Sequence, residues 1–240
     1  MKRQQLALAI LAGGEGRRIG GGKPVVELGS QTLLERAVER AAGWTDTVSI
    51  VLRSRDQTAT GGLPQLVDRQ DIEGPLGGLA AALAWANAVG AEFLLTIPCD
   101  MPFFPFDLWP RLLDDIGEAS AAIAASDGRL HPVCGLWRSD LAGLMEDYAS
   151  TGRRSLKGFA EMVGFTQVDW VADPFDPFFN INSPSDLQSA RSILGPRNRS
   201  PPPCHLRSIL VRRPVVGSVR KLQQASAERS NPGSREAPRQ

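Results

Sequence analysis

The sequence has 240 residues, of which 42% are apolar and 22% are charged, so its length and composition indicate a globular protein with one sizeable α/β core. No apolar stretch approaches the ~20 residues that a membrane helix needs, and the three cysteines form neither a CxxC pair nor a metal-ligand spacing. These features disfavour membrane proteins, disulfide-stapled secreted domains and cysteine-based metal proteins. We therefore expect a soluble, cytoplasmic protein.

The formal net charge of +1 hides two oppositely charged regions. Residues 196–240 hold 10 Lys and Arg against 2 Asp and Glu, a net charge of +8, whereas residues 1–195 hold 17 against 24, a net charge of −7. The basic region is rich in proline, arginine and serine, which predicts a disordered tail after a folded domain spanning residues 1–195. Because no aromatic residues alternate with its charges as stacking platforms, we do not expect it to bind nucleic acid.

The first predicted strand, residues 6–12, is a continuous apolar run that breaks into a loop with six glycines. The loop also carries Arg17, Arg18 and Lys23. Glycine lets successive backbone N–H groups approach an anion, and arginine and lysine side chains both match phosphate oxygens. The stretch therefore predicts a buried parallel strand followed by a loop that holds a nucleotide or polyphosphate.

The spacing of this loop narrows the choice of nucleotide fold. A Walker A loop is excluded because counting back from Lys23 places Arg17 at its first glycine and Pro24 at its hydroxyl residue. A dinucleotide-binding GxGxxG fingerprint would need glycine at Ile19, so it is only loosely matched. A flexible surface loop is the remaining alternative.

Residues 33–41 show helical apolar spacing and residues 48–52 form a second apolar strand, so together with the first strand they predict a βαβ unit. Arg53 and Arg55 follow at the carboxyl end of that strand, where ligands of open α/β sheets bind, although solvated arginines explain them equally well.

A short apolar step ends at Asp68, and a second glycine cluster, residues 74–78, opens onto an alanine-rich helix over residues 79–89. Gly77 and Gly78 at the helix start would let a nucleobase or pterin-like ring approach the backbone. A tight turn with close helix packing is the structural alternative.

The third apolar strand, residues 93–97, leads into Asp100, which is flanked by Pro98 and Pro102. A carboxylate at the exit of a central parallel strand faces the crevice of such a sheet. Because Mg²⁺ is commonly held by one or two carboxylates plus substrate phosphates, Asp100 is the best candidate for a Mg²⁺ ligand. The alternative is a helix-capping or turn aspartate.

Later segments complete an α/β pattern, with helices over residues 106–116, 141–148 and 156–162 and strands over residues 119–125 and 128–137. His131 could contact a phosphate or carry a proton, but a lone histidine is more often structural. Asn180 and Asn182, two apart on an extended stretch, would project to one side and could line the crevice or simply form a turn. Ser183 and Pro184 then predict a capped final helix that runs to about residue 194.

In this order, LAGGEGRRIGGGK, EGPLGGLAAAL, IPCDMP, HPVCGLW, GRRSLKGF and FFNINSP resemble the molybdenum cofactor guanylyltransferases across about four-fifths of the chain. The resemblance implies an α/β fold with a doubly wound, mostly parallel sheet, like that of the nucleotide-diphospho-sugar transferases. It also implies an enzyme that uses GTP and Mg²⁺ to attach GMP to the phosphate of Mo-molybdopterin and releases pyrophosphate.

The resemblance also implies roles for individual residues. The guanine nucleotide would lie against Leu11, Ala12, Gly13 and Asp68, its triphosphate against Gly14, Arg17 and Lys23, Mg²⁺ on Asp100, and the pterin substrate against Gly77, Gly78, Asn180 and Asn182. Catalysis would rest on Arg17, Lys23 and Asp100. One departure is that the family usually carries an aspartate directly before the lysine, where this chain has Gly22.

No serine, histidine or cysteine nucleophile is needed, because the phosphate of the cofactor is itself a nucleophile that the protein has only to align. Two alternatives remain. One is a transferase of the same fold that uses CTP or a sugar phosphate, and the other is a non-catalytic adaptor that delivers the cofactor to a partner. Contacts with a molybdoenzyme or a cofactor-delivery chaperone are expected partners, whereas membranes are not.

Overall fold

The computed structural model describes residues 6–14, 16, 19, 21–55, 57–72 and 74–195. The predicted tail, residues 196–240, and Arg17 lie outside the described residues. The strands are β1 (Leu6–Leu11), β2 (Glu27–Leu28), β3 (Gln31–Thr32), β4 (Val48–Leu52), β5 (Gln65–Val67), β6 (Phe93–Pro98), β7 (Ala121–Ser126), β8 (Arg129–Arg138) and β9 (Phe165–Trp170). The helices are α1 (Leu33–Ala42), α2 (Pro75–Ala88), α3 (Leu108–Ile116), α4 (Ala142–Ser150), α5 (Leu156–Val163) and α6 (Pro184–Leu194), with short 3-10 turns η2 (Lys23–Val25) and η3 (Ser139–Leu141).

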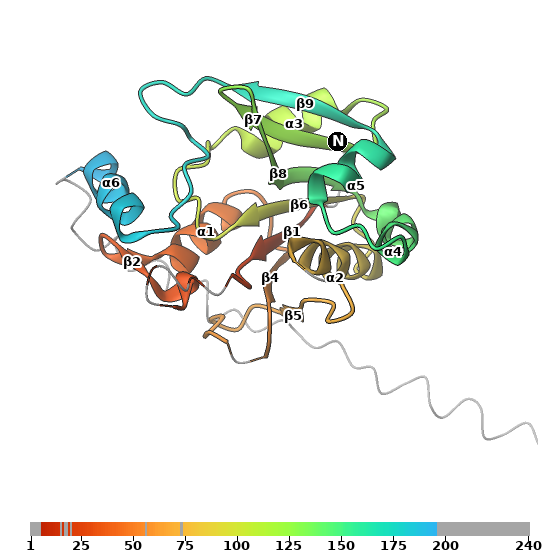
Figure 1. Cartoon of the computed structure of the whole chain (residues 1–240), viewed down its shortest axis with the longest axis horizontal. Helices are drawn as coiled ribbons and strands as arrows, with labels where there is room; N and C mark the ends of the chain where they lie inside the picture. Colours follow the sequence, from red (N-terminus) through yellow and green to blue (C-terminus); the bar gives the residue numbers. More distant parts are fainter. Residues whose placement is uncertain are drawn as a thin grey trace, which may run out of the picture.

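Seven strands form one sheet in the order β5-β4-β1-β6-β8-β7-β9 (Figure 1). Strand β8 runs antiparallel to both of its neighbours, β6 and β7, and the other four pairings are parallel. The predicted α/β class with a doubly wound, mostly parallel sheet is therefore confirmed. Strands β2 and β3 form a separate antiparallel ribbon.

The two faces of the sheet follow from the alternation of side chains along each strand. In β1, Leu8 and Ile10 face the layer that contains α1 and α3, while Ala7 and Ala9 face α2. Helices α4 and α5 cover the same face as α2 (Figure 1). The small alanine side chains of β1 allow α2, itself rich in alanine and buried on most sides, to pack closely on the sheet.

The glycine cluster at residues 74–78 lies differently from the prediction. Helix α2 begins at Pro75, four residues earlier than expected, so Gly77 and Gly78 lie within its first turns. Pro75 is well suited to the first helical position, where a backbone N–H would have no partner, and Gly74 before it has a φ of 75°. The glycines thus belong to the helix and not to a preceding loop.

Helix α6 packs on the β2 end of the molecule, over a small cluster that includes Leu28, Leu33 and Ile181 (Figure 1). Its N-terminus is the predicted one: Ser183 accepts a hydrogen bond from the Asp186 amide, and the Asp186 carboxylate accepts one from the Ser183 amide at 2.8 Å. This reciprocal cap ends the extended stretch that carries Asn180 and Asn182.

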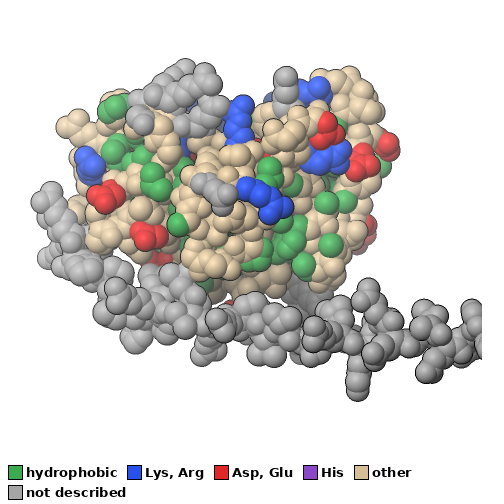
Figure 2. Space-filling view, turned by 90° about the horizontal axis from the view of Figure 1, so that it is seen from below, with side chains coloured by type: hydrophobic (Ala, Val, Ile, Leu, Met, Phe, Trp, Pro, Cys, Tyr) green, Lys and Arg blue, Asp and Glu red, His purple; other side chains and the backbone are tan. Residues whose placement is uncertain are grey.

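In the part of the chain that the structure describes, no helix is both long enough and apolar enough to cross a bilayer. Figure 2 shows a face on which basic and acidic side chains are interspersed with apolar ones, the pattern of an ordinary wet surface.

Candidate active site

A cavity of about 620 Å³ opens at the carboxyl ends of β1, β4, β5 and β6. Backbone hydrogen bonds continue past the strand ends, from Ala12 N to Val51 O at 2.8 Å, Asp68 N to Leu52 O at 2.8 Å and Cys99 N to Leu11 O at 3.1 Å. The residues directly after β1, β5 and β6 are therefore held side by side at one rim, the place where open α/β sheets bind ligands.

One end of the cavity holds a cluster that we call the lysine cluster: Lys23, Asp100 and Asn182. The Lys23 Nζ donates to Asp100 Oδ2 at 2.6 Å and to Asn182 Oδ1 at 2.5 Å. The side chains of Lys23 and Asp100 are only 13% and 15% exposed. The cluster brings together a cation, a carboxylate and an amide from distant parts of the chain.

Local backbone geometry holds Lys23 in this place. Gly22 precedes it with a φ of 60°, a left-handed conformation that glycine adopts without strain. Gly16 has a φ of 59°, and a Cβ there would lie 2.6 Å from Lys23 Cγ, so the glycine loop packs directly on the lysine stem. A larger residue at Gly16 would therefore have to displace the lysine stem.

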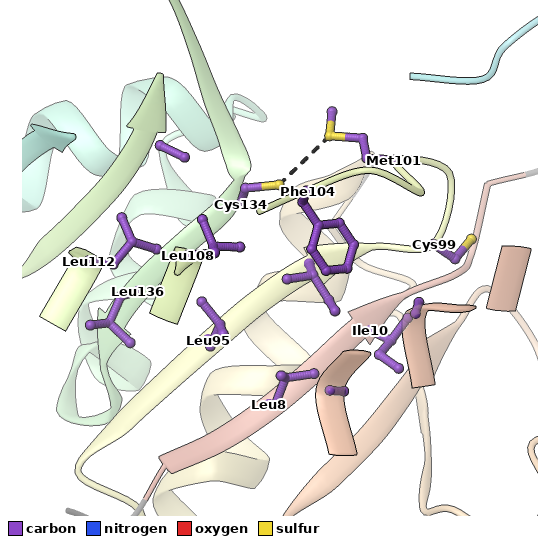
Figure 3. Close-up of a cluster of buried hydrophobic side chains, with 14 of the residues drawn as sticks. Leu8, Ile10, Leu95, Cys99, Met101, Phe104, Leu108, Leu112, Cys134 and Leu136 are labelled. Atoms are coloured by element: carbon purple, nitrogen blue, oxygen red, sulfur yellow. Dashed lines mark hydrogen bonds between the residues drawn. The ribbon is translucent and has the colours of Figure 1, made fainter. Parts of the chain in front are cut away.

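Asp100 is fixed by its neighbours on both sides. Cys99 and Met101 are buried at 3% and 5% exposure, and Met101 Sδ lies 3.7 Å from Cys134 Sγ of β8, which points toward it in Figure 3. The Asp100 carbonyl accepts a hydrogen bond from Ile181 N at 2.9 Å. Burial raises the pKa of the Cys99 thiol, so this cysteine stays protonated and is no nucleophile.

At the opposite end of the cavity, the Asp68 carboxyl lies between two glycines, and we call Gly13, Asp68 and Gly78 the aspartate niche. A Cβ at Gly13 would lie 3.0 Å from Asp68 Oδ2, and one at Gly78 would lie 3.1 Å from Asp68 Oδ1. Burial raises the pKa of Asp68 to about 6, and the nearby charge of Arg53 offsets only part of this effect. A carboxyl group held like this is typical of a functional site.

Asn180 also lines the cavity, and its Oδ1 is buried without a hydrogen-bond partner in the described structure. A buried acceptor with no partner carries a desolvation cost that a ligand donor removes. Asn180 therefore offers a hydrogen-bond acceptor to a bound molecule.

Most of the residues predicted from the sequence come together here. The cavity lining includes Leu11, Gly13, Gly14, Lys23, Asp68, Gly78, Asp100 and Asn180. Ala12 lies below the rim at 1% exposure, and Asn182 touches the site through Lys23. Gly77 does not line the cavity, because it faces the preceding loop: a Cβ there would meet Ile72 O at 2.6 Å and Arg69 O at 2.8 Å.

The prediction left out several lining residues, among them Arg69, Gln70 and Val133. Arg69 donates to Asp71 at 2.9 and 2.6 Å and to Glu146 of α4 at 3.0 Å, at the exposed rim. Its position directly after Asp68 was the only available sequence indication. Arg53, for which ligand contact and solvation were both open, does line the cavity.

Within the described residues no group of three or more His, Cys, Asp or Glu side chains is arranged to hold a metal ion. Asp100 alone, however, fits the pattern in which Mg²⁺ is held by one carboxylate, substrate phosphates and water. The unpartnered Asn180 oxygen, which lines the same cavity, is a further hard ligand. The residues present are thus compatible with a metal that arrives with a nucleotide, and not with a preformed metal cage.

A mostly parallel sheet whose strand ends hold a glycine-rich loop, a lysine and a buried carboxylate defines an α/β nucleotide-binding protein of the nucleotidyltransferase class. Residues 8–165 match the family described as MobA-like NTP transferase domain, and the chain belongs to this family. It is therefore a nucleotidyltransferase.

Individual relatives agree with this assignment. A protein of Cereibacter sphaeroides (strain ATCC 17029 / ATH 2.4.9) named molybdenum cofactor guanylyltransferase is 40% identical over 187 residues, covering 77% of this chain and 95% of the relative. A protein of the same name from Rhodopseudomonas palustris (strain BisB5) is 39% identical, covering 77% and 91%. The solved structure of molybdopterin-guanine dinucleotide biosynthesis protein A from Archaeoglobus fulgidus is 25% identical, with a TM-score of 0.64 over 78% of this chain and 98% of that one.

Proposed function

We propose that this protein transfers GMP from GTP to the terminal phosphate of Mo-molybdopterin, which yields the guanine dinucleotide form of the cofactor and pyrophosphate. Membership of a family whose curated relatives are named molybdenum cofactor guanylyltransferase carries the proposal. The cavity supports it, because a lysine that can bind phosphate, a carboxylate that can bind a metal ion and two asparagines lie at one site.

The triphosphate of GTP lies in this proposal over the lysine cluster and the glycine loop. The Lys23 ammonium group binds phosphate oxygens, as does Arg17 of the loop, and Asp100 holds Mg²⁺. The Mg²⁺ ion supplies charge neutralisation on the phosphates. Lys23 then stabilises the charge that develops on the departing pyrophosphate.

The guanine base lies at the aspartate niche, against Leu11, Ala12 and Gly13. Its N1–H and exocyclic N2–H₂ groups are adjacent donors, and an ionised carboxylate at Asp68 can accept from both. Cytosine presents a single exocyclic donor instead, so this end of the cavity favours guanine. Donors on the ligand also favour the ionised form of Asp68 and lower its pKa on binding.

The pterin substrate lies at the other side of Asp100, against Asn180 and Asn182. Gly78, which the resemblance assigned to the pterin substrate, lies beside Asp68 and belongs to the guanine end in this proposal. Its phosphate attacks the α-phosphorus of GTP, the bond to the β-phosphate oxygen breaks, and pyrophosphate leaves with the electron pair. The protein aligns the two substrates and forms no covalent intermediate. We place this reaction in the cytoplasm, with a molybdoenzyme or a cofactor-delivery chaperone as the recipient of the product.

The test uses purified full-length protein with Mg²⁺, Mo-molybdopterin and each of GTP, CTP, ATP and UTP in turn. Pyrophosphate and the dinucleotide product are both measured. Selective turnover of GTP is the expected result. Selective turnover of CTP would overturn the guanine assignment, and nucleotide binding without pyrophosphate release would indicate an adaptor.

A further inference from the structure

A buried polar network lies outside the cavity and plays no part in the mechanism above. Ser126 Oγ, at the end of β7, donates to Asp176 Oδ1 at 2.7 Å and lies 2.8 Å from His131 Nε2 of β8. Ser126 is 1% exposed and His131 is 6% exposed. The same Asp176 oxygen accepts a second hydrogen bond, from Phe178 N at 2.9 Å.

The direction of the hydrogen bonds in this network follows from its acceptors. The Asp176 carboxylate only accepts, so the Ser126 hydroxyl proton points to it. Ser126 Oγ must then accept from His131, which fixes the proton on Nε2. Burial lowers the pKa of His131 and keeps the ring neutral, although the charge of Asp176 acts in the opposite direction.

This order of groups differs from a hydrolytic Ser-His-Asp triad. There the histidine lies between serine and aspartate and takes the serine proton. Here the serine lies in the middle and its proton goes to the carboxylate. Ser126 is therefore a structural relay between a strand pair and a distant segment, and is not a nucleophile.

The segment that the network holds is the one that reaches the cavity. The His131 ring stacks on Phe178 with centroids 4.7 Å apart, and Phe178 also contacts Trp170 edge to face. Two residues after Phe178, Asn180 enters the cavity lining, and Ile181 N then bonds to Asp100 O. Residues 176–182 are thus attached to the β7–β8 pair at one end and to Asp100 at the other.

The order of strands indicates which substrate this segment serves. Asp68 follows β5, at one edge of the cavity, and Asp100 follows β6, whereas Val133 in the lining belongs to β8, beyond β6. Asn180 lies on the β8 side through the contact of Phe178 with His131. In the proposed function, that is the side of the pterin substrate and not of GTP.

We propose that Ser126 and His131 are positioning residues for the pterin substrate, which act through Asp176 and Phe178 to hold Asn180 in place. The inference rests on the proposed function for the identity of that substrate. That the network holds residues 176–182 rests on the geometry alone.

Three variants separate the hydrogen bond from the ring stack. Ser126→Ala removes the relay, His131→Phe keeps a stacked ring without the N–H donor, and His131→Gln restores an N–H donor near the Nε2 position. Ser139→Ala is the matched control, because Ser139 is a buried serine directly after β8 whose hydroxyl donates to Ala91 O and makes no hydrogen bond with residues 176–182 in the described structure.

We expect Ser126→Ala and His131→Phe to raise the KM for molybdopterin about tenfold and to leave the KM for GTP within about twofold. His131→Gln recovers part of the loss, and Ser139→Ala changes neither constant. A parallel rise in both constants, or an unchanged molybdopterin KM, would overturn the positioning role.

Hydrogen–deuterium exchange of the same proteins, measured without substrates, tests the network independently of the reaction. The amides of Phe178 and Ile181 should exchange faster in Ser126→Ala and His131→Phe than in the wild type or Ser139→Ala. Unchanged exchange in both variants would contradict the network even if the enzyme turns over GTP. Faster exchange in a protein that makes no dinucleotide would instead contradict the proposed function.

Discussion

The two ends of the cavity treat charge in opposite ways. In the lysine cluster, Lys23 and Asp100 neutralise each other at 2.6 Å, and Asn182 completes the contact. In the aspartate niche, burial of Asp68 outweighs the opposite charge of Arg53, and its pKa rises to about 6. One end is electrostatically balanced before any ligand arrives, and the other end is not.

This difference indicates how each end interacts with a ligand. At the lysine cluster a phosphate must compete with Asp100 for the ammonium group, and Asp100 becomes free for a cation as it does so, so that the two exchanges are coupled. At the aspartate niche a ligand only has to donate hydrogen bonds to a carboxyl group that is already desolvated. The first end is suited to binding phosphate and a cation for nucleotidyl transfer, and the second is suited to recognising a ligand through its hydrogen-bond donors.

The largest expected effect is at Asp100. Asp100→Asn keeps the shape of the side chain but removes the charge for the metal and for Lys23, so kcat should fall by roughly a thousandfold. Steady-state pyrophosphate release at saturating GTP measures it, and circular dichroism should show an intact fold. Asp114→Asn, on the exposed face of α3, is the control and should behave like the wild type. A fall in kcat of less than tenfold would rule out the metal role.

The second-largest effect is expected at Lys23, and variants at this position show how strongly Lys23 and Asp100 are coupled within the lysine cluster. Lys23→Met keeps the stem and removes the charge, so the KM for GTP should rise on the order of tenfold to a hundredfold. If the two side chains work as one unit, the double variant with Asp100→Asn costs less than the sum of the single variants. If the free-energy effects of the two single variants add up to the effect of the double variant, Lys23 and Asp100 act separately.

Asp68→Asn tests the aspartate niche through the pH dependence of the protein's stability. The carboxyl group ionises at about pH 6 in the fold but near 3.8 in the unfolded chain, so between these values the folded state binds more protons and stability falls as the pH rises. Asp68→Asn has no carboxyl group to ionise, so its stability does not fall in this way as the pH rises. Its Tm should therefore exceed that of the wild type above pH 6 and match it below pH 4.

The same variant should bind GTP on the order of tenfold more weakly, because the amide replaces one of the two acceptor oxygens by an NH₂ group, which is a donor and faces a guanine donor. Calorimetric titration with GTP at pH 7.5 measures this. A destabilised variant with normal GTP affinity would show that Asp68 is a structural residue. A gain in stability with a loss of affinity is the trade-off expected of a functional group.

Much of the fold followed from the sequence because the buried strands, residues 48–52 and 93–97 among them, are short apolar runs between turn residues. Strand β9, Phe165–Trp170, was missed although Gly164 precedes it, because it lies at the sheet edge and its alternation of polar and apolar residues is confined to its last three positions. The start of α2 was placed too late because glycines at residues 77 and 78 suggest a loop, whereas Pro75 is the actual first helical residue.

Several residues that line the cavity could be predicted from the sequence one at a time, but the contacts between them could not. Lys23 and Asp100 each follow a recognisable strand or loop, yet nothing local indicates that they touch across 77 positions, or that Asn182 joins them across 159. Gly77 and Gly78 were equivalent in the sequence. The helical rotation of about 100° per residue separates them, so that only Gly78 faces Asp68.

The smallest effect is expected at the rim, where the charges are most exposed. Arg69 is paired with Asp71 and Glu146, and the three side chains are 40%, 61% and 66% exposed. Pairs in this setting contribute little because water screens them and because holding long side chains costs entropy. Glu146→Gln should therefore leave kcat/KM for GTP within about twofold and the Tm within about 1 °C. A clear gain in GTP affinity would mean that Glu146 competes with the nucleotide for Arg69, and the rim would then resemble the lysine cluster, where a phosphate must displace a carboxylate before it can bind.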